Sequence, residues 1–174
     1  MLHDQAADLP ESGLTVVLEP ADSERSQLLQ SAFFADIADR YPGWSPTSSQ
    51  SVELSELGPP SGVWLVAYLG EVAVGCGGLQ RLDNESAEVR RLFLDERVRG
   101  HGIGRTLLTA LEKHARTLGY DRLLLTTGDR QPEALGLFRA VGYHEVAPFT
   151  DGRFTSHWME KHLASDAAPS GGQR

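Results

Sequence analysis

The stretch AEVRRLFLDERVRGHGIGR, residues 87–105, joins an apolar, strand-like run to a turn that holds three glycines. The turn, Arg99-Gly100-His101-Gly102-Ile103-Gly104-Arg105, opens a helix predicted over 102–118, where apolar side chains recur at helical spacing. Glycines at alternate positions leave backbone N–H groups open to close approach, and the helix N-terminus and the two arginines add positive charge. The segment therefore predicts a binding site for a phosphate-type anion. A flexible surface turn is the alternative.

Two common phosphate-binding motifs do not fit this turn. A dinucleotide fingerprint, G-x-G-x-x-G, needs its third glycine at position 105 or 107, where the chain has Arg105 and Leu107. A Walker loop needs Gly-Lys followed by Ser or Thr, and the sequence contains no such triplet. The pattern that remains is R-x-x-G-x-G, formed by Arg99, Gly102 and Gly104.

Outside this segment, apolar and β-branched runs predict strands at 14–18, 63–69, 72–79, 87–94, 122–126, 143–146 and 154–163. Helical spacing predicts helices at 22–40, 102–118 and 132–141, the first with apolar positions at Leu28, Leu29, Ala32, Phe33 and Ile37. The long loop 44–62, rich in Ser, Pro and Gly, contains one candidate short helix at 51–57. This order predicts a mixed α/β sheet with helices packed on it.

Composition limits the class of protein. The 174 residues and 40% hydrophobic content fit one globular domain, placed at 14–163 between a flexible N-terminus (1–13) and a disordered tail (164–174). The net charge of −8 argues against a nucleic-acid partner, and no run is long and apolar enough to cross a membrane. The polar first residues are unlike a secretory signal, and the single cysteine, Cys76, fits a reducing, cytoplasmic setting.

Charge is distributed unevenly along the chain. Residues 1–87 contain three Arg and thirteen acidic residues, a balance of −10, whereas 88–174 contain thirteen Lys and Arg and eleven acidic residues, a balance of +2. Five arginines fall within sixteen residues: Arg90, Arg91, Arg97, Arg99 and Arg105. Such a local basic cluster in an acidic protein indicates a small anion site rather than a long polyanion track, with solvated surface arginines as the alternative.

The combination of motifs resembles the GNAT superfamily of N-acetyltransferases. Residues 88–94, the turn 99–104 and the start of the following helix are similar to the family's fourth strand and coenzyme A loop. Pro132-Glu133-Ala134, Leu137-Phe138 and Gly142-Tyr143 resemble its second motif, N-x-x-A-x-x-L-Y-x-x-x-G-F, and the likeness covers residues 14–163. The resemblance implies a mostly antiparallel central sheet flanked by helices, with acetyl-CoA as the donor. Because many members of the family pair, it also makes a homodimer an expected partner.

The resemblance also implies which residues bind the donor. The pantetheine arm is expected along the backbone of Leu92, Phe93 and Leu94, and the pyrophosphate on the loop Arg99, Gly100, His101, Gly102, Ile103, Gly104 and Arg105. Gln131 replaces the usual Asn but can still exchange hydrogen bonds with the cofactor. Phe138 stands where many members carry a Tyr proposed as general acid, and a Phe has no proton to give.

Transfer of an acetyl group to an alkyl amine needs a base, because an amine with a pKa near 10.4 lies roughly 3 units above neutrality. Glu88, at the start of the strand that leads to the loop, is the candidate. A surface Glu paired with Arg90 or Arg91 is the alternative. Strict strand alternation places Glu88, Arg90, Leu92 and Leu94 on one face and Ala87, Val89, Arg91 and Phe93 on the other. No HExxH or CxxC spacing indicates a metal site.

The sequence thus favours an acetyl-CoA-dependent N-acetyltransferase acting on a primary amine of a small or amino-acid-like molecule. Its acidic first half is compatible with a cationic acceptor, and Trp44, in the long loop, is the aromatic residue expected to contact it. A protein N-terminal or lysine acetyltransferase is an alternative within the same class. A non-catalytic acyl-CoA-binding module, suggested by Phe138, and a nucleotide-binding protein that uses the same loop are alternatives from other classes.

Overall fold

The computed structural model describes residues 13–46 and 52–164. Its strands are β1 (Leu14–Leu18), β2 (Val63–Leu69), β3 (Val72–Arg81), β4 (Ser86–Leu94), β5 (Arg122–Thr127), β6 (His144–Glu145) and β7 (His157–His162). Its α-helices are α1 (Glu24–Arg40), α2 (Ile103–Thr117) and α3 (Pro132–Ala140), and two short 3₁₀-helices are η2 (Leu54–Leu57) and η3 (Glu96–Val98). The predicted strands and helices are therefore confirmed, with shifts of one to three residues at most of their ends.

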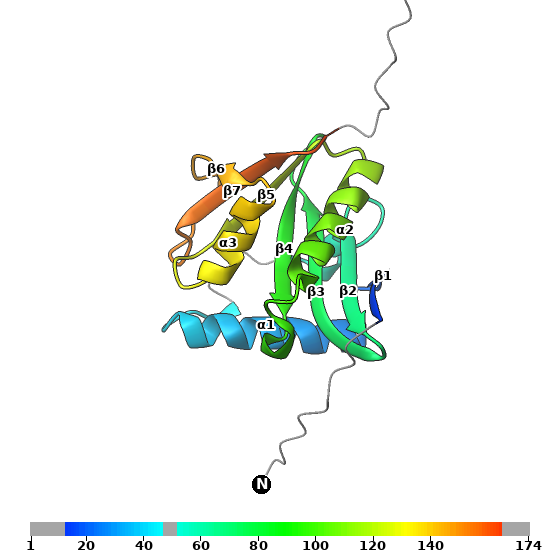
Figure 1. The fold of residues 1–174 in the computed structure, drawn as a ribbon. Helices are drawn as coiled ribbons and strands as arrows, with labels where there is room; N and C mark the ends of the chain where they lie inside the picture. The colour runs from blue at the N-terminus through cyan, green and yellow to red at the C-terminus, as the bar shows by residue number, and fades with distance from the viewer. Residues whose placement is uncertain (1–12, 47–51, 165–174) are drawn as a thin grey trace, which may run out of the picture.

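The strands form one seven-stranded sheet in the order β1-β2-β3-β4-β5-β7-β6. Only β4 and β5 pair in parallel, and the other neighbours are antiparallel. This confirms the predicted mixed, mostly antiparallel sheet. Figure 1 shows β4 in the centre of the sheet, with α2 and α3 lying over the two halves on either side of it. The parallel junction thus lies in the middle of the molecule, beneath the gap between these two helices.

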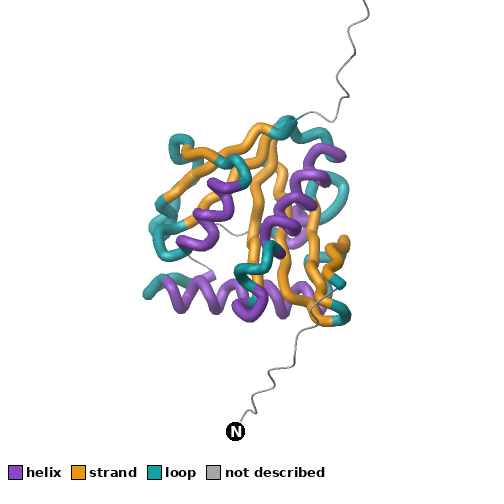
Figure 2. Tube along the Cα trace, in the orientation of Figure 1, coloured by secondary structure: helices purple, strands orange, loops and turns teal. Residues whose placement is uncertain are grey.

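Two apolar clusters hold the helices on the sheet. The cluster beneath α2 and α3 includes Leu107, Leu111, Leu123 and Met159, all fully buried. The cluster on the opposite face, beneath α1 and η2, centres on Trp64. Figure 2 shows α1 crossing the foot of the sheet, below the helices of the other face. The sheet is thus covered on both faces near β4.

Helix α1 differs from its predicted apolar stripe. Leu28 and Ala32 are exposed, whereas Leu29 and Ile37 are buried as predicted. Polar side chains are buried in the same helix: Ser26 accepts a hydrogen bond from Trp64 Nε1 at 3.0 Å, and Gln30 donates to Ala21 O at 2.8 Å. Burying a polar side chain costs little when it is hydrogen-bonded, so these residues replace apolar ones on the inner face.

Three other predictions fall at the ends of the described residues. The flexible N-terminus 1–13 and the tail 164–174 lie outside them, apart from Gly13 and Ala164. The candidate short helix at 51–57 is observed as η2, over Leu54–Leu57, with residue 51 outside the described ranges.

Candidate active site

The two central strands separate soon after they meet. β4 and β5 pair only from Ser86 to Glu88 and from Arg122 to Leu124. Beyond Glu88, no strand in the described part of the chain pairs with this edge of β4, and Figure 1 shows the two strands diverging. The gap is a cavity of about 750 Å³, lined by both strands and by α1, α2 and α3. An unpaired strand edge inside a cavity offers backbone N–H and C=O groups to an extended ligand.

A β-bulge interrupts β4 where it leaves β5. Gly78 faces Arg90 and Cys76 faces Phe93, so one residue of β3 lies opposite two residues of β4. The bulged residue Arg91 has a φ of +53°, a left-handed conformation that residues with side chains rarely adopt. Bulges of this kind bend a strand and redirect its side chains, and they are frequent beside active sites. Here the bulge turns the second half of β4 away from β5.

The bulge also overturns the predicted alternation of side chains. Leu92 and Leu94 pack with Val89 in the cluster beneath α2 and α3, not on the face of Glu88. Phe93 packs in the opposite cluster, with Trp64. The one extra residue explains the error, because it shifts every later side chain to the other face.

Glu88 lies at the last paired position of β4 and lines the cavity. It is only 4% exposed, so the interpretation of a surface glutamate is wrong. Its Oε2 lies 3.3 Å from Nη1 of Arg90, which confirms that part of the expectation. Burial raises the pKa of the Glu88 carboxyl, and Arg90 opposes the rise by charge and hydrogen bonding. A buried carboxylate with a raised pKa in a cavity is suited to accept a proton.

The glycine-rich loop lines one end of the cavity. Gly100 and Gly102 have φ values of +81° and +79°, and a Cβ at either position would meet no atom within 4 Å. They therefore supply both the turn and open space beside the N-terminus of α2, where the first backbone N–H groups have no partner within the helix. Gly104 has a different role, because its Cβ would lie 3.1 Å from side chains of Leu94 and Leu137.

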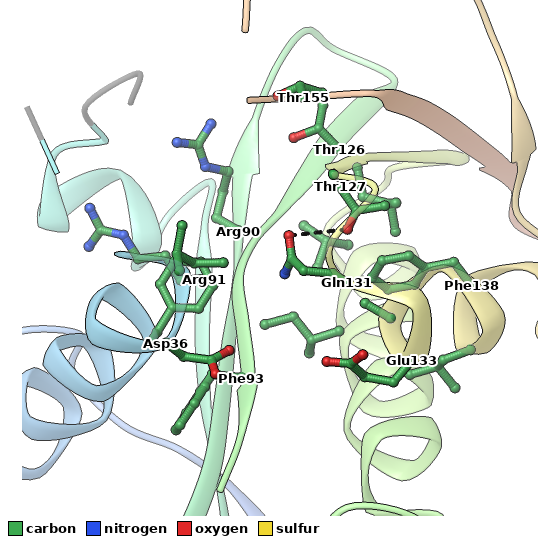
Figure 3. Close-up of a pocket in the computed structure, with 18 of the residues that line it drawn as sticks. Asp36, Arg90, Arg91, Phe93, Thr126, Thr127, Gln131, Glu133, Phe138 and Thr155 are labelled. Carbon is green, nitrogen blue, oxygen red and sulfur yellow. Dashed lines mark hydrogen bonds between the residues drawn. The ribbon is translucent and has the colours of Figure 1, made fainter. Parts of the chain in front are cut away.

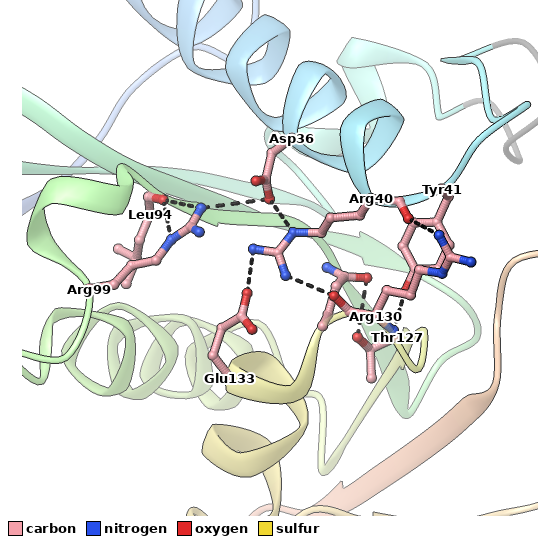
Figure 4. Close-up of polar contacts among 9 residues, drawn as sticks. Asp36, Arg40, Tyr41, Leu94, Arg99, Thr127, Arg130 and Glu133 are labelled. Carbon is pink, nitrogen blue, oxygen red and sulfur yellow. Dashed lines mark hydrogen bonds and ion pairs between the residues drawn. The ribbon is translucent and has the colours of Figure 1, made fainter.

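The three charged or polar side chains of the glycine-rich loop have different environments. Arg99 donates from Nε and Nη2 to the carbonyl of Leu94, at 3.1 and 2.9 Å, and its Nη2 lies 3.6 Å from Asp36 (Figure 4). Arg105 is exposed at the cavity wall. His101 is exposed, and its Nδ1 lies 3.0 Å from the carbonyl of Arg99. Arg99 therefore fastens the loop to the end of β4 as well as lining the cavity.

A polar network that the sequence analysis did not find joins α1 to α3 across the cavity (Figure 4). Arg40 forms ion pairs with Asp36, at 3.2 Å, and with Glu133. It also donates to the carbonyl of Arg130 at 2.9 Å, and Arg130 donates back to the carbonyl of Arg40 at 2.8 Å. Arg40 and Arg130 lie 90 positions apart in the chain, so no local sequence pattern indicates that they meet.

The α3 side of the cavity carries the second motif. Gln131 accepts a hydrogen bond from the Thr127 hydroxyl at 3.4 Å (Figure 3). Phe138 is 5% exposed and packs edge-on against Tyr143, with ring centroids 6.0 Å apart. The Tyr143 hydroxyl donates to Glu112 at 3.2 Å. Burial and this carboxylate raise the pKa of Tyr143, whose hydroxyl is bonded inside the protein.

The α1 side of the cavity is aromatic. Phe33, Phe34 and Trp44 line it, and the rings of Phe34 and Trp44 lie 5.9 Å apart. Trp44, which is expected to contact an acceptor, therefore lies at the cavity wall. Phe33 was predicted only as an apolar position of the first helix, and Phe34 was not predicted as a site residue. The adjacent pair of phenylalanines near the end of α1 was the available signal.

Other features of the described chain do not contribute to this site. Cys76 is buried in the core, which raises the pKa of its thiol. No group of three or more His, Cys, Asp and Glu residues within the described ranges could hold a metal ion. Within those same ranges, no helix is long and apolar enough to span a membrane.

The comparisons with known proteins agree with this fold and site. The sequence model of the Acetyltransferase (GNAT) family matches residues 28–143, and the chain belongs to this family. It is 37% identical to an "IAA acetyltransferase" from Azospirillum brasilense over 115 residues, which cover 64% of this chain and 74% of that protein. The chain spans 54% and 40% of two further curated relatives.

Solved structures show the same fold. A GNAT-family acetyltransferase from Staphylococcus aureus superposes with a TM-score of 0.74 at 18% identity, covering 87% of this chain and all of that one. A GNAT-family acetyltransferase from Elizabethkingia anophelis with acetyl-CoA bound superposes with a TM-score of 0.62 at 18% identity, covering 88% of this chain and all of that one. These structures therefore confirm the predicted fold, and the match of the family model confirms the family resemblance.

Proposed function

We propose that this chain transfers an acetyl group from acetyl-CoA to a primary amine of a small, amino-acid-like molecule. The observation that carries the proposal is the arrangement around the free edge of β4. This edge runs inside one cavity from the buried carboxylate of Glu88 to the glycine-rich loop at the start of α2. Membership of the GNAT acetyltransferase family and the relative named an acetyltransferase support the same chemistry.

The residues present fit the donor. The N-terminus of α2 and the open space at Gly100 and Gly102 suit a pyrophosphate, and Arg105 adds charge at the same end. The free edge of β4 at 92–94 suits the amides of a pantetheine arm, with Phe138 beside it. Acetyl-CoA, when bound, supplies an acetyl group activated as a thioester. The acetyl-CoA complex of the Elizabethkingia anophelis protein supports this choice of donor.

Glu88 is proposed to take the proton from the amine. Holding a lysine-like amine neutral near pH 7 costs about 4–5 kcal/mol, so a base lowers the barrier. Burial raises the pKa of the Glu88 carboxyl, which makes it a better proton acceptor, and Arg90 limits the rise.

No dedicated acid is proposed at position 138. The coenzyme thiol has a pKa near 8.5, so its thiolate is a tolerable leaving group near neutral pH. Phe138 has no proton to give, and the hydroxyl of Tyr143 already donates to Glu112. Solvent is therefore proposed to protonate the thiolate, and Phe138 to pack against the donor.

Thiol release from acetyl-CoA, measured across a panel of amines, tests the proposal. Glu88→Gln is expected to lower turnover by roughly 10–10⁴-fold, the range for loss of a general base, with little change in acetyl-CoA affinity. Glu85→Gln is the matched control, because Glu85 is exposed at the end of the β3–β4 turn. Unchanged turnover in Glu88→Gln with an accepted amine contradicts the proposed base.

A further inference from the structure

The guanidinium of Arg91 has an unusual environment for a positive charge. The residue is half-buried at the bulge of β4 and lines the cavity. No carboxylate of the described chain forms an ion pair with it. Burial lowers the pKa of Arg91, and the nearby charge of Arg90 lowers it further. A half-buried charge without a counter-ion in the protein is costly, so it calls for an anionic ligand.

Helix α1 holds this guanidinium in place. Arg91 lies over the ring of Phe34, with Cζ 4.8 Å from the ring centroid, and it donates from Nη1 to the side-chain oxygen of Gln30. Gln30 is itself fixed by hydrogen bonds to the carbonyls of Ala21 and Ser26, at 2.8 and 3.2 Å. The bond to Gln30 uses one N–H donor of the guanidinium, and the other donors keep the planar fork of the side chain. This fork matches the two oxygens of a carboxylate.

The bulge is what brings the charge to this side. Regular alternation would direct Arg91 to the face of α2, opposite Arg90. In the structure both guanidinium groups lie on the same side of β4, toward α1, while Gln131 and Phe138 lie on the other side of the cavity (Figure 3). The cavity is thereby divided into a side that fits the donor and a side that remains for the acceptor.

The other charges of the acceptor side are largely matched. Glu88 is paired with Arg90, and Asp36 is paired with Arg40 and Arg99. Asp151, the remaining wall carboxylate here, is exposed on the loop before β7, where Arg153 also lines the cavity. The buried part of this side therefore carries a net positive charge, contrary to the cationic acceptor suggested by the acidic first half of the chain.

We propose that the acceptor amine also carries a carboxylate, which Arg91 binds, and an apolar group, which packs against Phe34 and Trp44. This inference rests on the proposed acetyl transfer, because it assigns the acceptor of that reaction. Its chemical class is an amino acid with an apolar or aromatic side chain. Arg91 is thus a specificity-determining residue, whereas Glu88 takes the proton.

Paired ligands that differ only in the carboxylate test this assignment. Binding of L-phenylalanine, L-phenylalaninamide and 2-phenylethylamine, and of L-leucine and L-leucinamide, is measured by calorimetry with coenzyme A present. The wild-type protein is expected to bind at least one acid about 10–100-fold more tightly than its amide, the scale of a charge-assisted hydrogen bond. Arg91→Met removes this preference and leaves affinity for the amide and for coenzyme A unchanged.

Two further variants keep the test decisive. Arg139→Met removes an exposed arginine of α3 that pairs with Glu145, and it is expected to keep the preference. Arg91→Lys keeps the charge but loses the fork, so it is expected to weaken acid binding by several-fold even if Arg91→Met does not fold. The proposal is overturned if no acid binds more tightly than its amide, or if Arg91 variants weaken both ligands equally.

The binding measurement separates this inference from the proposed function. Selective binding of an acid without thiol release contradicts acetyl transfer while supporting the role of Arg91. Thiol release with amides as fast as with acids supports acetyl transfer and overturns the role of Arg91. Absence of binding by every member of the panel overturns the assigned acceptor class.

Discussion

Replacement of Arg90 by Met is predicted to move the acidic limb of the pH–rate profile to higher pH. The guanidinium lies 3.3 Å from the Glu88 carboxylate and favours its ionised form. At this distance two unit charges interact by about 1–5 kcal/mol for effective dielectric constants between 80 and 20. Loss of the charge therefore raises the pKa of Glu88, and each 1.36 kcal/mol of lost interaction changes its ionisation constant about tenfold. A base must be ionised to act, so activity at lower pH falls first.

The assay is kcat/KM for an accepted amine between pH 5 and 9, with Glu88→Gln and Arg97→Met beside Arg90→Met. Arg97 is an exposed arginine that pairs with Asp95, so its variant is expected to retain the wild-type profile. Glu88→Gln is expected to lose the limb altogether. If the acidic limb stays at the same pH in Arg90→Met, the argument that Arg90 lowers the pKa of the base Glu88 is refuted.

Stability supplies a second readout of the same pair. The pKa of Glu88 is raised above its usual value of 4.5, so the folded state binds its proton more readily than the unfolded chain does. The contribution of Glu88 to stability is therefore lost as pH rises from about 4.5 through the folded-state pKa. Arg90→Met widens this window upward, and urea unfolding at pH 5 and pH 8 is expected to show a larger difference than in the wild type. If the free energy of unfolding differs between pH 5 and pH 8 by the same amount in both proteins, this prediction is contradicted.

Four further predictions concern the donor side. Gly102→Val is expected to weaken coenzyme A binding more than Arg99→Ala, because position 102 has a φ of +79° and its side chain would occupy the space beside the loop; wild-type affinity in a folded variant contradicts the loop assignment. Arg99→Ala is expected to weaken coenzyme A binding by about 1.5–3 kcal/mol and to weaken pantetheine binding less. If calorimetry shows equal losses of affinity for the two ligands, Arg99 acts through the carbonyl of Leu94. Phe138→Ala is expected to lower the free energy of unfolding by about 3–5 kcal/mol in urea titrations, because the ring is 5% exposed. Phe138→Tyr is expected to change turnover by less than about tenfold, and a gain on the order of 10²–10⁴-fold would show that a needed acid is missing.

Local sequence patterns predicted most of the fold. The apolar stripe of α2, with Gly102 before it and Gly119 after it, placed both ends of the helix within a residue of Ile103–Thr117. Alternate glycines before a helix announced the loop, since both positive φ and open space favour glycine there. The parallel pairing of β4 with β5 was not predicted, because neither strand's own residues mark its neighbour in the sheet.

The parts that were missed depend on contacts between distant segments. A bulge needs one extra residue in a pair of strands, and nothing in the local sequence marks an arginine, Arg91, as the residue that takes a positive φ. The faces of Leu92 and Phe93 were wrong for this reason. Periodicity alone likewise could not place Gln30 inside, because its burial depends on the carbonyl of Ala21. The bulge at Arg91 and the burial of Gln30 together determine the side of the cavity that is proposed for the acceptor.

Formation of an N-acetylated product from acetyl-CoA tests the central claim most directly. The wild-type protein is incubated with acetyl-CoA and the panel of amino acids and amines, and products are identified by mass spectrometry alongside release of the coenzyme thiol. We expect an N-acetyl product in amounts equal to the thiol released, and expect it to decline sharply in Glu88→Gln. Tight coenzyme A binding with no acetylated product from any amine contradicts the proposed enzyme and indicates an acyl-CoA-binding module instead.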